Sequence, residues 1–353
     1  MSDLRYIDIV RHVAELGMIL TLITNTAMIY ITVFHIKNIK GVYRFLLLFI
    51  AILGMIFAVM ESFVHPFFHS FNGSFVYFTN APTFGPTMLI KALPLLIYSE
   101  IYLLIICVIA IQFVYRYLVI SNSKLVKLFS GWRIVIWICY YAFFMVIWGY
   151  SAIICLPDQF SIDYLKTEII SSYGRCADEV VGFYIVAYEG SHHDFRTNAI
   201  ICTIGLISAL VAQYIVIIYC GFKLHSKIQE TMRVTSTKHD HIQSQLFKTL
   251  VFQITAPSLF YHLPALLLFI VPYFDLEISF PSGIMVCFFS LYPAIDSWIL
   301  MGLVTEYHRV IGKILKKLLT QALEWTNRLL SGTEMDRTTR ATRAPRDHVL
   351  GIA

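Results

Sequence analysis

IYLLIICVIAIQFVY, residues 101–115, is a run of 15 residues without a charged side chain. A helix needs about 20 mostly apolar residues to cross the hydrocarbon of a bilayer. Six further stretches have this apolar character, and short polar segments separate them. Because the apolar residues are continuous and do not alternate with polar ones, we expect helices and not the strands of a membrane barrel. The predicted spans are residues 13–34, 44–66, 88–117, 132–154, 197–222, 246–272 and 282–304.

The overall composition agrees with a membrane protein. Of the 353 residues, 58% are hydrophobic and only 14% are charged, and the mean hydropathy is +0.70. Soluble domains carry roughly a quarter charged residues, so a soluble core could not hide this much apolar surface. We therefore predict an all-α membrane protein, a single bundle of seven transmembrane helices.

The distribution of Lys and Arg predicts the orientation of the bundle across the membrane. The connections after the first, third and fifth spans carry 12 Lys and Arg residues, whereas those after the second, fourth and sixth carry 4. Lys and Arg concentrate in cytoplasmic loops. We therefore expect the N-terminus outside and the C-terminal tail in the cytoplasm. The sequon Asn72-Gly-Ser then lies in an outside loop, where Asn72 is a candidate glycosylation site unless it lies too close to the membrane.

The connection of residues 155–196 is the longest on the predicted outside, and it is rich in Asp and Glu. Long loops are often functional, so it could fold as a lid over the bundle; the alternative is a solvated acidic loop. It also holds Cys155 and Cys176, the two cysteines predicted to lie outside. An oxidising exterior would permit a disulfide between them, but the sequence does not supply the geometry that a bridge needs.

The C-terminal segment divides into two parts. In residues 305–330 apolar positions recur at helical spacing among Lys313, Lys316 and Lys317, which predicts an amphipathic helix on an anionic membrane surface. Residues 331–353 are polar and rich in Thr and Arg, and we expect a disordered cytoplasmic tail. The predicted organisation is thus an extracellular N-terminus (1–12), a transmembrane domain (13–304), a surface helix and a tail.

Ionisable side chains within membrane spans are costly, and each is a hypothesis of function. Glu61, Lys91 and Glu100 lie toward the predicted outer ends of the second and third spans. They could form a pocket that opens outward, or Glu61 and Lys91 could form an internal ion pair that only fixes helix packing. The candidate ligand-binding residues are Glu61, Lys91, Tyr98, Glu100, Tyr261 and His262.

Motifs of enzymes are absent from the sequence. It contains no H-E-x-x-H, no G-x-S-x-G, no phosphate loop and no C-x-x-C pair. The seventh span has no lysine that could form a retinal Schiff base. We therefore expect no catalytic activity, no cofactor and no metal site.

At the level of motifs the chain resembles nematode chemoreceptors, the seven-helix serpentine receptors of the Str class. The stretch QSQLFK, residues 243–248, leads into VFQITAP, residues 251–257, which is similar to the family's entry into its sixth helix. FSLYPAID, residues 289–296, is similar to the family's Y-P-x-x-D-P element, with Ser297 in place of the final proline. FVYRY, residues 113–117, is similar to the F-x-Y-R-Y at the inner end of the third helix.

The resemblance implies a G-protein-coupled receptor that senses a small odorant or soluble chemical and activates a heterotrimeric G protein. It also implies olfactory sensory transduction in the ciliary membrane of sensory neurons. From its place in the family's F-x-Y-R-Y motif, Arg116 would face the G protein or lock the inactive state. The residues assigned to coupling and switching are Tyr115, Arg116, Tyr117, Gln245, Lys248, Pro293 and Asp296.

Two other functions are compatible with seven spans. A ligand-gated seven-helix channel of the inverted type needs the N-terminus inside, against the distribution of Lys and Arg. An orphan membrane scaffold needs no ligand at all.

Overall fold

The computed structural model describes residues 3–36, 39, 41–190, 194–234, 238–274, 276, 279–281 and 283–342. The chain divides into two compact units, Met1–Val304 and Thr305–Ala353. Within the first unit, seven helices are long and apolar enough to cross a membrane, which confirms the predicted number of spans. The protein is a multi-pass membrane protein.

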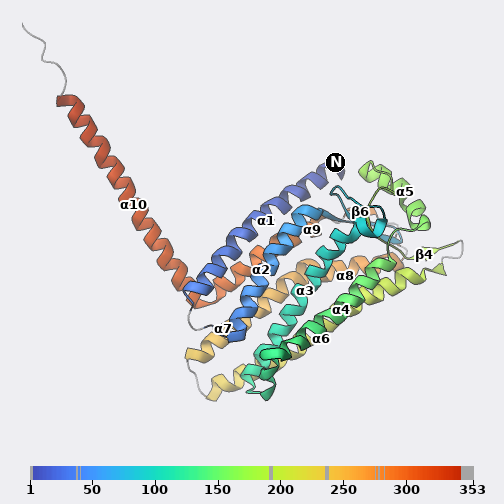
Figure 1. The fold of residues 1–353 in the computed structure, drawn as a ribbon, viewed down its shortest axis with the longest axis horizontal. Coiled ribbons are helices and arrows are strands. Elements are labelled where there is room, and N and C mark those ends of the chain that lie inside the picture. Colours follow the sequence, from blue (N-terminus) through green and yellow to red (C-terminus); the bar gives the residue numbers. More distant parts are fainter. Residues whose placement is uncertain are drawn as a thin grey trace, which may run out of the picture. The chain divides into compact units, whose positions relative to one another are not determined.

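The seven spans lie side by side in a bundle (Figure 1). The sixth span is broken by a π-helical turn, Ser258–His262, which is followed by α8 (Leu263–Ile270). Most of the spans continue beyond their predicted ends. The first part of the sixth span is α7 (Lys238–Pro257). The other six spans are α1 (Asp3–Phe34), α2 (Gly41–Val64), α3 (Met88–Ile120), α4 (Val135–Ile154), α6 (Thr197–Val234) and α9 (Gly283–Leu303).

The helices differ in how much of their surface is covered by protein. α3 is buried through much of its length, on positions all around the helix. α4, by contrast, buries only Trp148, Ser151 and Ala152, so the rest of its apolar surface faces lipid. A helix that is hydrophobic on all sides is compatible with either environment. Hydrophobicity alone therefore does not distinguish the central helix α3 from the peripheral helix α4.

One end of the bundle is covered by a β-sheet, and we call it the sheet end. Its four antiparallel strands run in the order β3-β2-β1-β6 and come from three separate connections between spans. Asn72, at φ 45°, lies in the tight Asn-Gly turn between β1 and β2, as is typical of hairpins. The strands are β1 (Pro66–Phe71), β2 (Ser74–Thr79), β3 (Gly182–Val186) and β6 (Ser279–Pro281).

The predicted helical bundle is confirmed, and this sheet is a feature that the sequence analysis did not predict. Phe67 pairs with Phe78 across the hairpin, and Ser74 pairs with Val186 of β3. The strands are short and directly follow or precede apolar spans, so their hydropathy is easily read as an extension of the helices. Their pairing partners lie far away in the sequence, which no local pattern reveals.

The connection of residues 155–196 is folded. Its helix α5 (Gln159–Tyr173) begins with a capping box between Asp158 and Ser161 and ends at Gly174. The Arg196 guanidinium binds Asp158 at 2.5 Å and Glu189 at 3.1 Å. Burial alone would raise the pKa of Asp158, but the bonds from Ser161 and Arg196 hold it below its ordinary value. The segment thus has ion pairs and a buried helix face that a solvated loop lacks. β4 (Tyr188–Glu189) and β5 (Asp194–Phe195) form a second, two-stranded sheet.

The opposite end of the bundle contains two short 3₁₀ helices, Lys124–Phe129 and Gly131–Ile134. The second unit consists of one helix, α10 (Thr305–Thr342), with Leu315, Leu318 and Leu323 exposed. This exposed apolar stripe is compatible with the predicted surface helix. The helix extends past residue 330, where disorder was expected, since the intervening residues carry no proline. The remainder of the predicted tail, residues 343–353, lies outside the described residues.

A close approach of α1 and α9 generates the first prediction. A Cβ atom added at Gly17 would lie 2.5 Å from the carbonyl oxygen of Ser290, and small residues are what allow membrane helices to pack closely. Gly17→Leu should lower the free energy of unfolding by about 1–3 kcal/mol, the usual cost of overpacking. Thermal unfolding in lipid nanodiscs measures the loss.

The matched control is Gly302→Leu, because a Cβ at this helical glycine would meet no atom within 4 Å. Equal losses in the two variants would contradict the close packing of α1 against α9.

Candidate functional site

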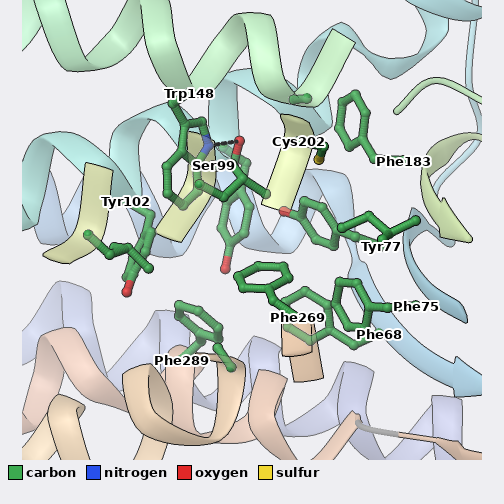
Figure 2. A pocket seen from close by; sticks show the side chains of 16 residues that line it. Phe68, Phe75, Tyr77, Ser99, Tyr102, Trp148, Phe183, Cys202, Phe269 and Phe289 are labelled. Atoms are coloured by element: carbon green, nitrogen blue, oxygen red, sulfur yellow. Dashed lines mark hydrogen bonds between the residues drawn. The ribbon is translucent and has the colours of Figure 1, made fainter. Parts of the chain in front are cut away.

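An aromatic cavity lies under the sheet, between the strands and the helices (Figure 2). Its volume is about 60 Å³. The side chains that line it come from three strands and five helices, and most of them are aromatic. They are Phe68, Phe75, Tyr77, Tyr98, Ser99, Tyr102, Trp148, Ala152, Phe183, Ile185, Cys202, Leu206, Leu210, Ala265, Phe269 and Phe289.

The cavity wall contains polar groups but no charged side chain. The indole nitrogen of Trp148 donates a hydrogen bond to the Ser99 hydroxyl at 3.1 Å, which ties α4 to α3 (Figure 2). Tyr77, Tyr98 and Tyr102 contribute the other hydroxyls. A wall of this kind suits a small, largely apolar ligand that carries at most a few hydrogen-bonding groups.

A second cavity of about 50 Å³ lies deeper along the sixth span. Tyr102 and Phe289 line both cavities, and their rings meet edge to face at 5.4 Å. These two side chains therefore form the partition between the cavities. His262, at the end of the π turn, lines the second cavity together with Pro257.

The π turn follows from the chemistry of Pro257. Proline has no N–H, so the carbonyl of Gln253, four residues earlier, loses its helical partner. The Tyr292 hydroxyl donates to that carbonyl at 3.4 Å and so connects α9 to α7. Inside the turn, the Ser258 hydroxyl bonds the Ile254 carbonyl at 2.5 Å, and the Tyr214 hydroxyl of α6 bonds both Ser258 and His262. π turns of this kind are frequent at functional sites.

Only part of the predicted ligand site lines these cavities. Tyr98 lines the first and His262 the second, whereas Glu61, Lys91 and Glu100 line neither. The side chain of Tyr261 lies outside the described residues. The sequence missed Trp148, Phe289 and the strand aromatics, because aromatic residues are common throughout this chain.

The intramembrane carboxylates have other partners. Glu61 is buried and accepts a hydrogen bond from Ser290 of α9, with the Tyr98 hydroxyl beside it. The predicted alternative, an ion pair between Glu61 and Lys91, is not formed. Glu100 faces α4, where one of its carboxylate oxygens is buried without a hydrogen-bond partner and Gly149 lies close to the other. The bond from Ser290 to Glu61 connects α9 to α2.

Arg116 forms an interhelical lock at the opposite end of the bundle. Its side chain is only 3% exposed. The guanidinium donates to the side-chain oxygen of Gln243 on α7 at 2.5 Å and stacks over the Tyr43 ring of α2, 4.5 Å from the ring centre. Tyr115 lies parallel to Tyr43, with ring centres 6.4 Å apart. One side chain of α3 thus bridges to α2 and α7.

The other predicted switch residues are spread around this lock. Asp296 is buried between Gln253 and Tyr292. Pro293 packs closely against Gly54 of α2. Tyr117 and Gln245 are half-buried and Lys248 is exposed. Gln243, which bonds Arg116, was not among the predicted switch residues and lies two residues before Gln245 in the same motif.

The thiols and potential metal ligands form no further centre. Cys155 and Cys176 are both free, the first buried and the second exposed, so the suggested disulfide is absent; the side chain near Cys155 is instead Cys202. Across the part of the chain that the structure describes, no three His, Cys, Asp or Glu side chains are grouped so that they could hold a metal ion.

The bundle has the fold of a G-protein-coupled receptor. Squid rhodopsin superposes with a TM-score of 0.54 over 91% of this chain and 88% of its own, at 14% sequence identity.

The family follows from the sequence comparison. Residues 10–312 match the model of the serpentine type 7TM GPCR chemoreceptor Str, and the chain belongs to this family. It is 38% identical over 313 residues to the G-protein coupled receptor str-33 of Caenorhabditis elegans, covering 87% of this chain and 91% of that protein. Serpentine receptor class r-10 of Caenorhabditis elegans is 24% identical, covering 89% of this chain and 93% of its own.

The partition between the cavities generates the second prediction. Phe289→Ala should join the two cavities and lower the free energy of unfolding by about 3–5 kcal/mol, the usual cost of truncating a core phenylalanine. Toluene should bind the enlarged apolar space and recover part of the loss. Thermal unfolding in nanodiscs with and without toluene measures both effects.

Phe252→Ala is the control, because Phe252 is 53% exposed on α7 and faces the lipid. Its loss should be small and insensitive to toluene. Equal losses in the free energy of unfolding of Phe289→Ala and Phe252→Ala would contradict the role of Phe289 in separating the two cavities.

Proposed function

We propose that this protein is a chemosensory receptor that binds a small, neutral, largely apolar molecule in the aromatic cavity and activates a heterotrimeric G protein at the Arg116 end. The uncharged aromatic cavity is the observation that carries the proposal. Membership of the Str family supports the receptor class. A ciliary membrane of a sensory neuron is the location that fits such a role.

The cavity wall sets the chemistry of the ligand. A charged molecule would lose its hydration there without gaining a countercharge, and burying an unpaired charge is strongly unfavourable. Aromatic walls favour a ligand with a ring or a compact hydrocarbon body. The hydroxyls of the wall tyrosines, such as Tyr102, would orient one polar group by a hydrogen bond. The preferred ligands are therefore small neutral odorants.

A chain of contacts connects this cavity to the lock. Phe289 borders the ligand cavity, Tyr292 on the same helix bonds the Gln253 carbonyl, and α7 continues from there to Gln243. A ligand that displaces Phe289 would favour a different position of α9 against the π turn. Only a ligand that binds this second state more tightly shifts the equilibrium toward it. Movement of α7 would then separate Gln243 from Arg116.

The direction of the bundle in the membrane is the third prediction. The excess of Lys and Arg in the connections opposite the sheet favours the sheet end outside. An epitope tag at Met1 should therefore be stained by antibody on intact cells, because the N-terminus of α1 is at the sheet end (Figure 1).

A tag after Ala353 is the matched control and should be stained only after permeabilisation. The reverse pattern would contradict the receptor orientation and would favour the inverted ligand-gated channel.

The role of the lock is the fourth prediction. Separation from Gln243 would leave the Arg116 guanidinium available to the G protein. Arg116→Ala removes this group, so the mutant should lose ligand-evoked signalling while still reaching the cell surface. A panel of small neutral aromatic compounds, read out by cytosolic calcium or cyclic nucleotide, supplies the active ligand. Surface staining of the tagged receptor measures delivery.

Arg133→Ala is the comparison, since Arg133 is exposed at the same end of the bundle and has no bridging role. It should signal normally. Normal signalling by Arg116→Ala would contradict the proposed role of Arg116 in coupling to the G protein.

A further inference from the structure

A third, larger cavity opens at the sheet end, and none of its lining residues belongs to the aromatic cavity. Its volume is about 250 Å³. α1, the start of β1, the end of β2 and the end of α5 meet there, and we call it the vestibule. It is lined by Ile7, Asp8, Val10, Arg11, Ala14, His65, Pro66, Phe67, Asn80, Tyr173, Arg175 and Val286.

Two arginines on different elements face the vestibule. Arg11 of α1 makes only long ion pairs on its own helix, with Asp8 at 4.0 Å and Glu15 at 3.9 Å, and neither distance is short enough for a hydrogen bond. Arg175, in the turn after α5, has neither an ion pair nor a hydrogen bond within the described part of the chain. One guanidinium at the vestibule is thus left without a protein partner.

His65 adds an unused hydrogen-bonding atom. Its Nδ1 is buried and has no hydrogen-bond partner. Burial, together with the positive charge of Arg11, lowers the pKa of His65 despite the opposing charge of Glu15, so the imidazole is neutral at physiological pH. A neutral imidazole offers one N–H donor. Leaving such a buried nitrogen unpaired is unfavourable, and a bound acceptor would satisfy it.

The backbone holds His65 in this position at a cost. Its φ of 45° lies in the left-handed region, which residues other than glycine seldom adopt. Its N–H bonds the Glu61 carbonyl at 2.9 Å and its carbonyl accepts from Asn80 at 3.0 Å. Strained residues of this kind cluster at ligand sites.

The floor of the vestibule is apolar and aromatic, with Phe67 and Tyr173 among its residues. The Tyr173 hydroxyl is engaged with Nδ1 of His69 at 2.8 Å, so this tyrosine offers mainly its ring. A ligand that fits has a flat apolar body and an anionic planar group, which a guanidinium binds through two parallel hydrogen bonds.

We propose that the vestibule is a second ligand site, which binds small aromatic carboxylates through Arg175, Arg11 and Nδ1 of His65. The site is independent of the proposed odorant cavity, whose wall carries no charge. A receptor with both sites responds to a neutral ligand in one and to an anion in the other.

Binding is tested on purified full-length receptor in nanodiscs with three probes of equal size: sodium benzoate, benzamide and benzylamine. Benzoate should raise the thermal unfolding midpoint in a saturable manner, as a ligand of the folded state does. Benzamide and benzylamine should not. A larger shift with either of these than with benzoate would overturn the assignment of a carboxylate.

Arg175→Gln should weaken benzoate binding about tenfold, the effect of losing one charge-assisted contact, and Arg175→Lys should recover part of it. Lys166→Gln removes an exposed cation of α5 that does not line the vestibule and should leave binding unchanged. Equal benzoate binding in wild type and Arg175→Gln would disprove the site. An unfolding midpoint of ligand-free Arg175→Gln close to that of wild type shows that the variant is folded. Because benzoate binding is measured without any odorant, its outcome does not depend on the proposed odorant cavity.

Discussion

Pro257 cannot donate a hydrogen bond to the carbonyl of Gln253, and much of the bundle is arranged around that missing bond. In a membrane no water is present to replace it. Tyr292 supplies the donor from α9, and the chain passes through a π turn that is held by Tyr214 of α6. One proline thereby connects the sixth span with the helices on both sides. The same turn places His262 at the inner cavity.

The charges buried in the bundle are used for structure, and the cavity that suits an odorant has none. Glu61 bonds Ser290 across 229 positions of sequence, and Asp296 lies between Gln253 and Tyr292. An intramembrane charge is a reasonable hypothesis of a binding site. In this protein the aromatic side chains under the sheet line the first cavity, and Glu61 and Asp296 lie outside it.

The sequence predicted what depends on local composition and motif. Long apolar runs identified the seven spans, and the F-x-Y-R-Y resemblance identified Arg116. It could not identify Gln243 as a partner of Arg116, because the two lie 127 positions apart in the sequence. The sheet was missed for the same reason, since the pairing of β2 with β3 joins residues about a hundred positions apart along the chain.

The sheet also ties together connections that are separate in the sequence. β1 and β2 follow α2, β3 follows α5, and β6 precedes α9, yet they form one hydrogen-bonded layer. The layer supplies Phe68, Phe75, Tyr77 and Phe183 to the roof of the aromatic cavity. Transplanting one connection from a relative would leave its neighbours without matching edge partners. An exchange of this cavity roof between relatives therefore requires the connections to be transferred as a set, and a change in one strand constrains the strands that pair with it.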